Sequence, residues 1–171
     1  MACEILSGIT CSCGYSASGV EKLWVANKSQ VTAAVYNADG ELTGFTSGTT
    51  YNLFEICAAT DSITFTDDLV VNGSRRNFLQ SITFGLNEID ADILAILEQI
   101  GLSNLVAFIK DAAGNFRAFG LKSTGLRATV MTSASGTAAG NDGNISVTIS
   151  GSSLGKASFI DATWATTMGL S

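Results

Sequence analysis

The fold is decided by Asn87-Glu-Ile-Asp-Ala-Asp-Ile-Leu-Ala-Ile-Leu-Glu-Gln-Ile-Gly101, the one stretch with the pattern of an amphipathic helix. Its apolar side chains recur every three or four residues, which places them on one broad face. The face expected to pack consists of Ile89, Ile93, Ile96, Leu97 and Ile100, and it is widened by Leu94. Asn87 is suited to cap the first turn, and Gly101 to end the helix in a left-handed conformation. The sequence therefore predicts a helix over residues 87–101.

Much of the remaining chain has the two-residue alternation of β-strands. In Ser62–Thr66, and again in Ser81–Gly85, apolar side chains alternate with small or hydroxyl-bearing ones. Between these runs, Asn72-Gly73 is a strong signal for a hairpin turn. Residues 61–84 are therefore predicted to form one long hairpin.

Shorter apolar or alternating runs predict the other strands. They are Val20–Asn27, Val31–Asn37, Leu42–Phe45, Tyr51–Ala59, Leu105–Ile109, Phe116–Gly120, Leu126–Met131, Ile145–Ser150 and Ala157–Trp164. About ten strands and one helix indicate a mainly β protein, an antiparallel β-sandwich or small barrel with the helix packed against it. We expect residues 1–19 to form an N-terminal arm, 20–165 a single domain, and 166–171 a C-terminal tail.

The composition of the chain favours a protein that associates with other subunits. Only 14% of the residues are charged and 46% are hydrophobic, so we expect neighbouring subunits to cover part of the surface. The net charge is −6, from 9 Lys and Arg against 15 Asp and Glu. This balance lacks the basic footprint of a nucleic-acid reader, yet it suits DNA that passes without adhering.

The sequence gives no indication of an enzyme. It contains no His, the commonest general base, and no spacing pairs a nucleophile with a base. We therefore expect no catalytic residue and no cofactor. Ser135–Asn144 lacks the ending of a phosphate-binding loop and the carboxylates of a calcium loop, so it is interpreted as a turn between strands.

Four cysteines are present, and they admit three interpretations, namely a zinc site, small buried or loop thiols, and disulfides between subunits after release from a cell. Cys3, Cys11, Cys13 and Cys57 could form a zinc site, but their spacing is a poor match to tetrahedral zinc motifs. Because no signal peptide precedes them, synthesis in the cytosol with reduced thiols is expected. No apolar run approaches the roughly 20 residues of a membrane span, so no membrane insertion is expected.

The predicted hairpin carries opposite charges on its two arms. Asp67 and Asp68 lie before the turn, and Arg75 and Arg76 follow it. These charges could pair within the hairpin, where an exposed pair contributes about 0–1 kcal/mol. Alternatively, they could contact a neighbouring subunit and set the register between the two. In the second case the contact residues are Asp67, Asp68, Asn72, Gly73, Arg75 and Arg76.

The order of these parts resembles the tail tube proteins of tailed bacteriophages and the related tubes of type VI secretion and other contractile injection systems. Strands, a long hairpin, one helix and further strands follow one another over roughly residues 20–165. Three stretches are similar to such virion proteins in their residues as well as in their pattern. They are Phe119-Gly-Leu-Lys-Ser-Thr-Gly-Leu-Arg127, Ser135–Gly140 and Asn144–Gly151. The arm around Cys11-Ser-Cys13 has no counterpart in that pattern.

The resemblance implies a structural protein of the virion, made in the host cytoplasm. Six copies would close into a ring, and rings would stack into a hollow tail tube that conducts DNA without binding it specifically. The hairpin would reach the adjacent ring, and other tail proteins would be further partners. Tail terminators, hub rings and head–tail connectors share this fold and remain alternatives.

One alternative of a different class is a β-sandwich that binds carbohydrate. Such a module would use aromatic side chains on an exposed face. The candidates are Trp24, Tyr36, Tyr51 and Trp164. Since aromatic residues on the faces of a sandwich more often belong to its core, the tube hypothesis is favoured.

Overall fold

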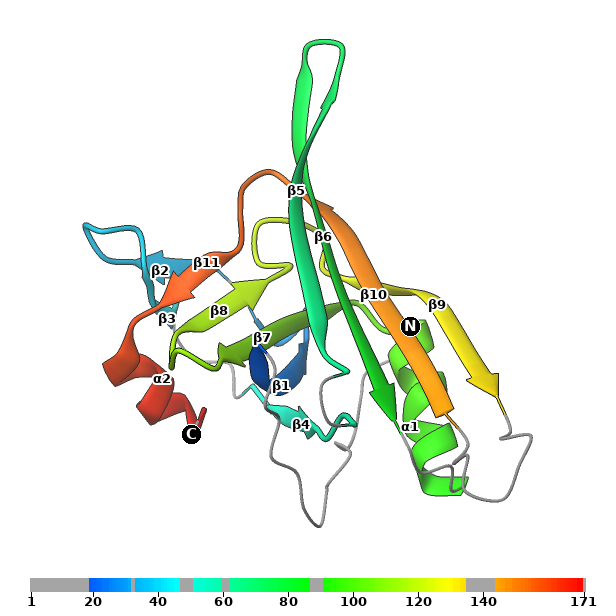
Figure 1. Cartoon of the computed structure of the whole chain (residues 1–171). Helices are drawn as coiled ribbons and strands as arrows, with labels where there is room; N and C mark the ends of the chain where they lie inside the picture. Colours follow the sequence, from blue (N-terminus) through cyan, green and yellow to red (C-terminus); the bar gives the residue numbers. More distant parts are fainter. Residues whose placement is uncertain are drawn as a thin grey trace.

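The chain folds into two β-sheets and two helices, which form an open sandwich rather than a closed barrel (Figure 1). The computed structural model describes residues 19–31, 33–46, 51–59, 62–86, 91–134 and 144–170. Within these ranges there are eleven strands. In the strand orders given below, each strand is hydrogen-bonded to the strands named next to it. The sandwich prediction is therefore confirmed.

The larger sheet has seven strands. Their order is β2 (Ala34–Tyr36), β3 (Leu42–Phe45), β11 (Ser158–Ile160), β8 (Phe116–Phe119), β7 (Leu105–Asp111), β1 (Val20–Asn27) and β4 (Phe54–Ile56). All pairs are antiparallel except β11 with β3, which are parallel. The apolar strand β7 lies between β8 and β1, in the interior of the sheet.

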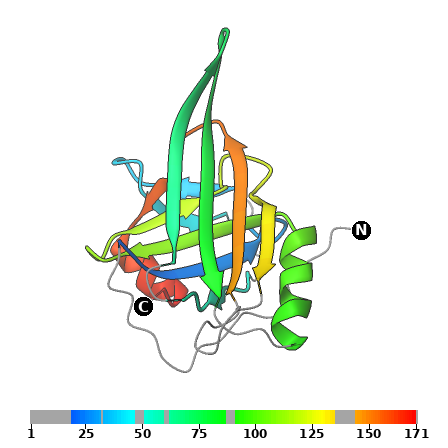
Figure 2. The same cartoon turned by 45° about the vertical axis from the view of Figure 1, so that its right-hand side comes forward.

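The smaller sheet has four strands, all antiparallel. Their order is β5 (Thr64–Asn72), β6 (Arg75–Leu86), β10 (Asn144–Ser153) and β9 (Arg127–Ala134). These strands run steeply across those of the larger sheet (Figure 2). The predicted hairpin is confirmed as β5–β6, although its arms begin at Thr64 and end at Leu86.

Both faces of the central strands of the larger sheet are buried, which explains why these strands are rich in apolar residues. On β1, Leu23 and Val25 join the core between the two sheets, together with Phe84 of β6 and Val147 of β10. Trp24, the residue between them, belongs to a second core on the opposite face. The protein thus has two hydrophobic layers, one on each side of this sheet.

Helix α1 (Ala91–Leu102) lies beside β9, at the side of the sandwich (Figures 1 and 2). Ile96, Leu97 and Ile100 are buried in the core between the sheets, and Ile93 packs against that core. The packing face is therefore as predicted at these four positions, whereas Ile89 lies outside the described residues. Leu94 does not widen the face, because 45% of its side-chain surface is exposed.

The predicted left-handed cap at Gly101 is wrong, because this glycine lies inside α1 and has no positive φ. A Cβ atom at this position would meet no other atom within 4 Å. Gly101→Ala should therefore raise the free energy of unfolding by about 0.5–1 kcal/mol, since glycine is a poor helix former. Denaturant unfolding would measure this gain. A loss of stability would show that the position needs a left-handed backbone.

The C-terminal part differs from the expected strand and tail. Only Ser158–Ile160 form a strand, and α2 (Ala162–Met168) follows. The Asp161 side chain caps this helix by accepting a hydrogen bond from the Trp164 backbone N–H, and Gly169 ends it with a φ of 80°. Ala165, Met168 and Leu170 are buried against the larger sheet, so the tail prediction is wrong for this segment.

The other differences concern the lengths of elements. Two predicted strands are shortened to β2 and β4, and β10 extends three residues beyond Ser150, to Ser153. No helix within the described ranges is long and apolar enough to cross a membrane. The predicted arm and the predicted Ser135–Asn144 turn lie outside the described residues, except for Gly19 and Asn144.

Candidate functional site: the projecting hairpin, its base and the outer sheet face

The β5–β6 hairpin projects far beyond the two sheets (Figure 1). The last pair between β10 and β6 joins Ser153 to Phe78, so the hairpin tip, residues 70–77, pairs only with itself. Asn72 pairs with Arg75, and the turn between them is Gly73-Ser74, one residue later than predicted. Gly73 has a φ of 62°, a conformation that glycine adopts without steric cost.

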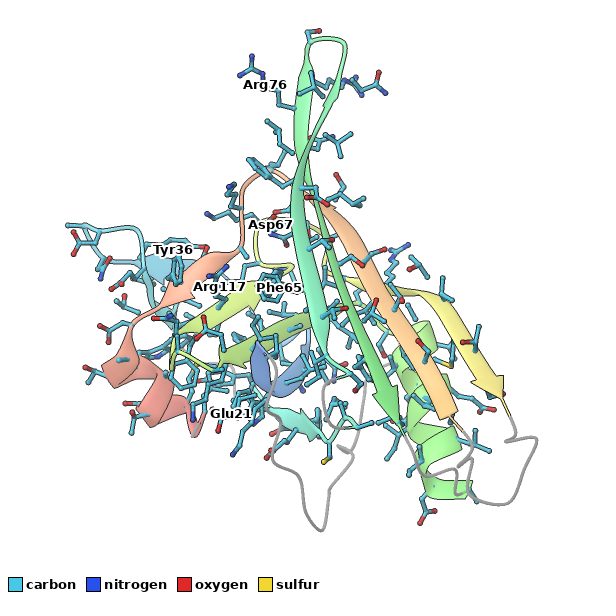
Figure 3. All side chains as sticks on the ribbon, viewed as in Figure 1. Glu21, Tyr36, Phe65, Asp67, Arg76 and Arg117 are labelled. Carbon is cyan, nitrogen blue, oxygen red and sulfur yellow. The ribbon has the colours of Figure 1, made fainter. Side chains whose placement is uncertain are left out.

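The register separates the charges that could have paired within the hairpin. Arg76 lies opposite Val71, whereas Asp68 lies opposite Leu79, three rows closer to the body. At roughly 3.3 Å per residue, three rows amount to about 10 Å, too far for an ion pair. Within the described part of the chain, Arg75 and Arg76 form no ion pair, and Figure 3 shows Arg76 pointing away from the body.

The hairpin also exposes apolar side chains. Leu69, Val70, Val71 and Leu79 are all more than 40% exposed. Val71 pairs with Arg76 across the hairpin, so an apolar and a basic side chain lie next to each other on one face of the tip. Exposed apolar side chains next to unpaired charges are typical of surfaces that bind another protein.

A buried polar cluster holds the base of the hairpin. Gln80 is only 1% exposed, and its Oε1 accepts a hydrogen bond of 2.9 Å from the Gly120 backbone N–H. Its Nε2 donates to the carbonyl oxygen of Gly155 at 3.3 Å and to Asp67 Oδ1 at 3.4 Å. The other oxygen of Asp67 accepts from the backbone N–H of Ala157 at 2.8 Å. Asp67 therefore fixes the hairpin to the body and is not available at its tip.

Gln80 was not among the predicted site residues, although the sequence carries a signal. It precedes Ile82, Phe84 and Leu86 at a two-residue spacing, so it lies in the phase that points into the core. A polar side chain in that phase needs partners, because an unpaired buried polar group is costly. The structure supplies those partners from the ends of β8 and β10.

Gln80→Leu should lower the free energy of unfolding by about 1–3 kcal/mol, because it leaves the buried Gly120 N–H without its partner and removes the donor to Asp67, while the Gly155 carbonyl keeps its bond from Ser153. Chemical denaturation would measure the change. The matched control is Ser81→Ala, on the outer side of the same strand, which should change stability by less than about 0.5 kcal/mol. Equal losses in the two variants would show that the cluster does not hold the hairpin base.

The turn after β8 is held from its other side by Lys28. The ammonium Nζ of Lys28 donates a 2.8 Å hydrogen bond to the Leu121 carbonyl oxygen, and burial lowers the pKa of this lysine. Gly125 has a φ of 102° and approaches the Leu105 backbone so closely that an added Cβ would lie 2.9 Å from its oxygen. The turn that receives Gln80 is therefore fixed against the larger sheet.

The outer face of the smaller sheet carries mainly hydroxyl groups. Pairing and burial place one set of Ser and Thr side chains there, named here the hydroxyl face: Thr64, Thr66, Ser81, Thr83, Thr132, Ser146, Thr148 and Ser150. The hydroxyls of Thr83 and Thr148 are 2.9 Å apart and hydrogen-bonded. Charged side chains in the same alternation lie at its margins, namely Asp68 on β5, Arg75 at the hairpin tip and Arg127 on β9.

The two outer edges of this sheet, those of β5 and β9, pair with no strand in the described ranges. An unpaired edge presents backbone N–H and carbonyl groups to any other strand that can reach it. The sheet thus has two edge strands without a strand partner in the described ranges, and helix α1 lies beside one of them, β9.

A shallow hollow of about 460 Å³ lies beside the hairpin base. It is lined by Asn77, Leu121, Lys122, Ser123, Thr124, Ser152, Ser153 and Leu154. Lys122 is the one charged side chain in this lining, so the hollow does not pair an acid with a base. Its geometry does not support a catalytic site.

The cysteine prediction requires a correction. Cys57 is disulfide-bonded, which contradicts the expectation of reduced thiols. A disulfide sulfur is not a thiolate, the form that binds zinc. Cys3, Cys11 and Cys13 lie outside the described residues, and those described contain no group of three or more potential metal ligands.

The aromatic residues considered for carbohydrate binding belong largely to the core. Trp24 is 4% exposed. Trp164 and Tyr51 pack edge-on against Phe45, with ring centroids 5.0 and 5.6 Å apart, and burial raises the pKa of the Tyr51 hydroxyl. Tyr36 is half-buried, with the Lys122 ammonium 5.2 Å from its ring centre. These rings do not form a common exposed platform.

Comparisons with known proteins give no indication of the function. No protein-family model, curated protein or solved structure matches the chain.

Proposed function

We propose that this chain is a structural subunit of a phage tail, which assembles into hexameric rings that stack as a DNA-conducting tube. The observation that carries the proposal is the smaller sheet, with two unpaired edges in its described part and an uncharged hydroxyl face between them. Its function would be its shape and its surfaces rather than catalysis.

The edges supply a mechanism for ring closure. When the β5 edge of one copy pairs with the β9 edge of the next, the four-stranded sheets join into one continuous sheet. This head-to-tail contact uses two different surfaces on each copy, and such contacts close into rings when the rotation between copies permits it. Ring closure would leave no edge of this sheet exposed.

The hydroxyl face suits the inside of such a ring. Its hydroxyl groups bind water and one another, as Thr83 and Thr148 do, and carry no positive charge that would hold phosphate groups. The net charge of −6 adds a weak repulsion between the protein and DNA. DNA would therefore pass through the ring without adhering to it.

The projecting hairpin suits contacts between rings. Its tip combines exposed Val70 and Val71 with Arg75 and Arg76, which have no ion-pair partner in the described part of their own chain. A two-stranded ribbon of this kind is poorly stable alone, so binding to a neighbour would order it. The sixfold symmetry and the place in a phage tail come from the resemblance in sequence.

Sedimentation velocity of the purified protein over a concentration series tests the proposal. We expect a species of six subunits, followed by larger species as rings stack, and no retention of added DNA. Rings that never stack would favour the connector, terminator or hub alternative. A monomer at every concentration would contradict the proposed function.

A further inference from the structure

We propose that the hairpin tip of one copy binds a specific surface on a second copy, formed by the β2–β3 turn and the adjoining ends of β2 and β11. This surface, named here the acidic corner, consists of Val35, Asp39, Glu41 and Phe159. The inference rests on the proposed self-assembly and adds the partner surface of the hairpin, which that proposal leaves open.

The acidic corner combines two carboxylates with exposed apolar side chains. Val35 is 44% exposed and Phe159 is 45% exposed, both on the side of the sheet away from the second core. Strand β11 pairs in parallel with β3 through Ile160 and Leu42, which places Phe159 next to Glu41. The Arg117 guanidinium lies 4.7 Å from the centre of the Phe159 ring, so the negative charge of the corner resides in Asp39 and Glu41. These carboxylates are the complement of Arg76, which lies beside Val71 at the tip.

The turn that carries the carboxylates is held in one conformation. Asn37 Oδ1 accepts hydrogen bonds from the backbone N–H groups of Asp39, at 3.0 Å, and Glu41, at 2.8 Å. The N–H of Asn37 donates in turn to the Glu41 carbonyl oxygen at 2.9 Å. A preformed turn loses little conformational freedom on binding, which favours recognition.

Other carboxylates in the described part of the chain are largely committed. Glu21 and Glu55 form ion pairs with Lys110 and Lys22. Asp111 accepts hydrogen bonds within its own turn, and Asp161 caps α2. Asp67 accepts hydrogen bonds from Gln80 and Ala157, and Asp92 is likewise not free.

By contrast, Asp39 and Glu41 form no ion pair within the described ranges, although Glu41 Oε2 accepts a hydrogen bond from Asn37. They are two residues apart on the turn, Asp39 exposed and Glu41 half-buried. Arg75 and Arg76 are consecutive on β6 and point to opposite faces of the hairpin, so Arg76, on the Val71 face, is the arginine that would meet these carboxylates. Asp68 and Glu98 are single carboxylates on other surfaces, the hairpin itself and α1.

The contact must join two copies. In both views the tip points away from the body, and the β2–β3 turn lies apart from it (Figures 1 and 2). Because the tip and the corner are different surfaces, each copy can use its tip on one neighbour and its corner on another. Such a contact continues from subunit to subunit and is therefore suited to an assembly of many copies.

Charge reversal tests the contact through two variants, Arg75→Glu/Arg76→Glu and Asp39→Lys/Glu41→Lys. Like charges would then face each other at the contact, and each variant alone should need an about tenfold or higher concentration to assemble, as measured by sedimentation velocity. An equimolar mixture of the two variants should assemble nearly as the unmodified protein does. When the two variants alternate, the negative tip of one meets the positive corner of the other, and the positive tip of the second meets the negative corner of the first. Glu98→Lys, on the exposed side of α1, is the control and should assemble normally.

Three outcomes would overturn the inference. If both variants assemble like the unmodified protein, the contact does not exist, although the proposed function stands. If only the tip variant fails, or the mixture does not recover, the tip binds another surface. If the unmodified protein remains a monomer, the contact and the proposed function both fail. Unchanged circular dichroism spectra and melting temperatures would establish that each variant is folded.

Discussion

Leu97→Asp should abolish folding or strongly reduce the free energy of unfolding. The expected loss is larger than that for Leu97→Ala, which is about 2–5 kcal/mol. Leu97 is 2% exposed and lies in the core between the sheets. Aspartate at this position would place an unpaired charge where water cannot reach it, a cost larger than that of the lost packing. The total stability of a typical domain is only about 5–15 kcal/mol, so this one change is expected to consume most of it.

Leu94 provides the matched control on the same helix. Its side chain is 45% exposed, so Leu94→Asp and Leu94→Ala should each change stability by less than about 1 kcal/mol. Denaturant unfolding of the variants at both positions would measure the difference. Similar losses at Leu94 and Leu97 would show that α1 packs through a different face.

Gly151→Ala should lower the free energy of unfolding by about 1–3 kcal/mol, because it forces two backbone segments apart. A Cβ atom on Gly151 would lie 2.6 Å from the carbonyl oxygen of Gly125, closer than such atoms approach in real proteins. Gly125 belongs to the turn that begins at Gly120, and the Gly120 N–H binds the Gln80 side chain at the hairpin base. Gly151 itself pairs with Gln80, so the substitution would disturb the hairpin base from two sides. Thermal or denaturant unfolding would measure the loss.

Gly155→Ala is the control for this substitution. Its added Cβ would lie 3.0 Å from Lys122 Cδ, and that flexible side chain can move aside. We expect a change of less than about 0.5 kcal/mol. If Gly151→Ala is tolerated as well as Gly155→Ala, the approach of the two backbone segments does not limit the fold.

The parts of the fold that could be predicted are those with strong periodicity. Ile96, Leu97 and Ile100 recur at helical spacing, and all three are buried as expected. The alternation in the two arms of the hairpin likewise identified β5 and β6. In both cases one face is buried along the whole element, so the hydrophobic pattern contains enough information.

The second helix was missed because its sequence has a low helix propensity. Ala162–Met168 is rich in Thr, which forms helices poorly, and its seven residues are too few for a clear period. The better signals were local, namely Asp161 three residues before Trp164 and Gly169 after the last turn. Packing of Ala165 and Met168 against the larger sheet stabilises a helix that propensity alone would not.

The charge arrangement of the hairpin could not be predicted, since it depends on register. A turn at Gly73-Ser74 instead of Asn72-Gly73 shifts every cross-strand pair by two residues. The acidic corner was also missed, because Glu41 is brought beside Phe159 only when β11 joins the distant β3. Composition and periodicity contain no information on such long-range pairings.

The most direct test of the central claim is negative-stain electron microscopy of the purified protein over a concentration series, with light scattering to measure its mass. The proposal predicts sixfold rings with an open lumen that stack into tubes as the concentration rises. Particles with the mass of a single chain at every concentration would contradict it.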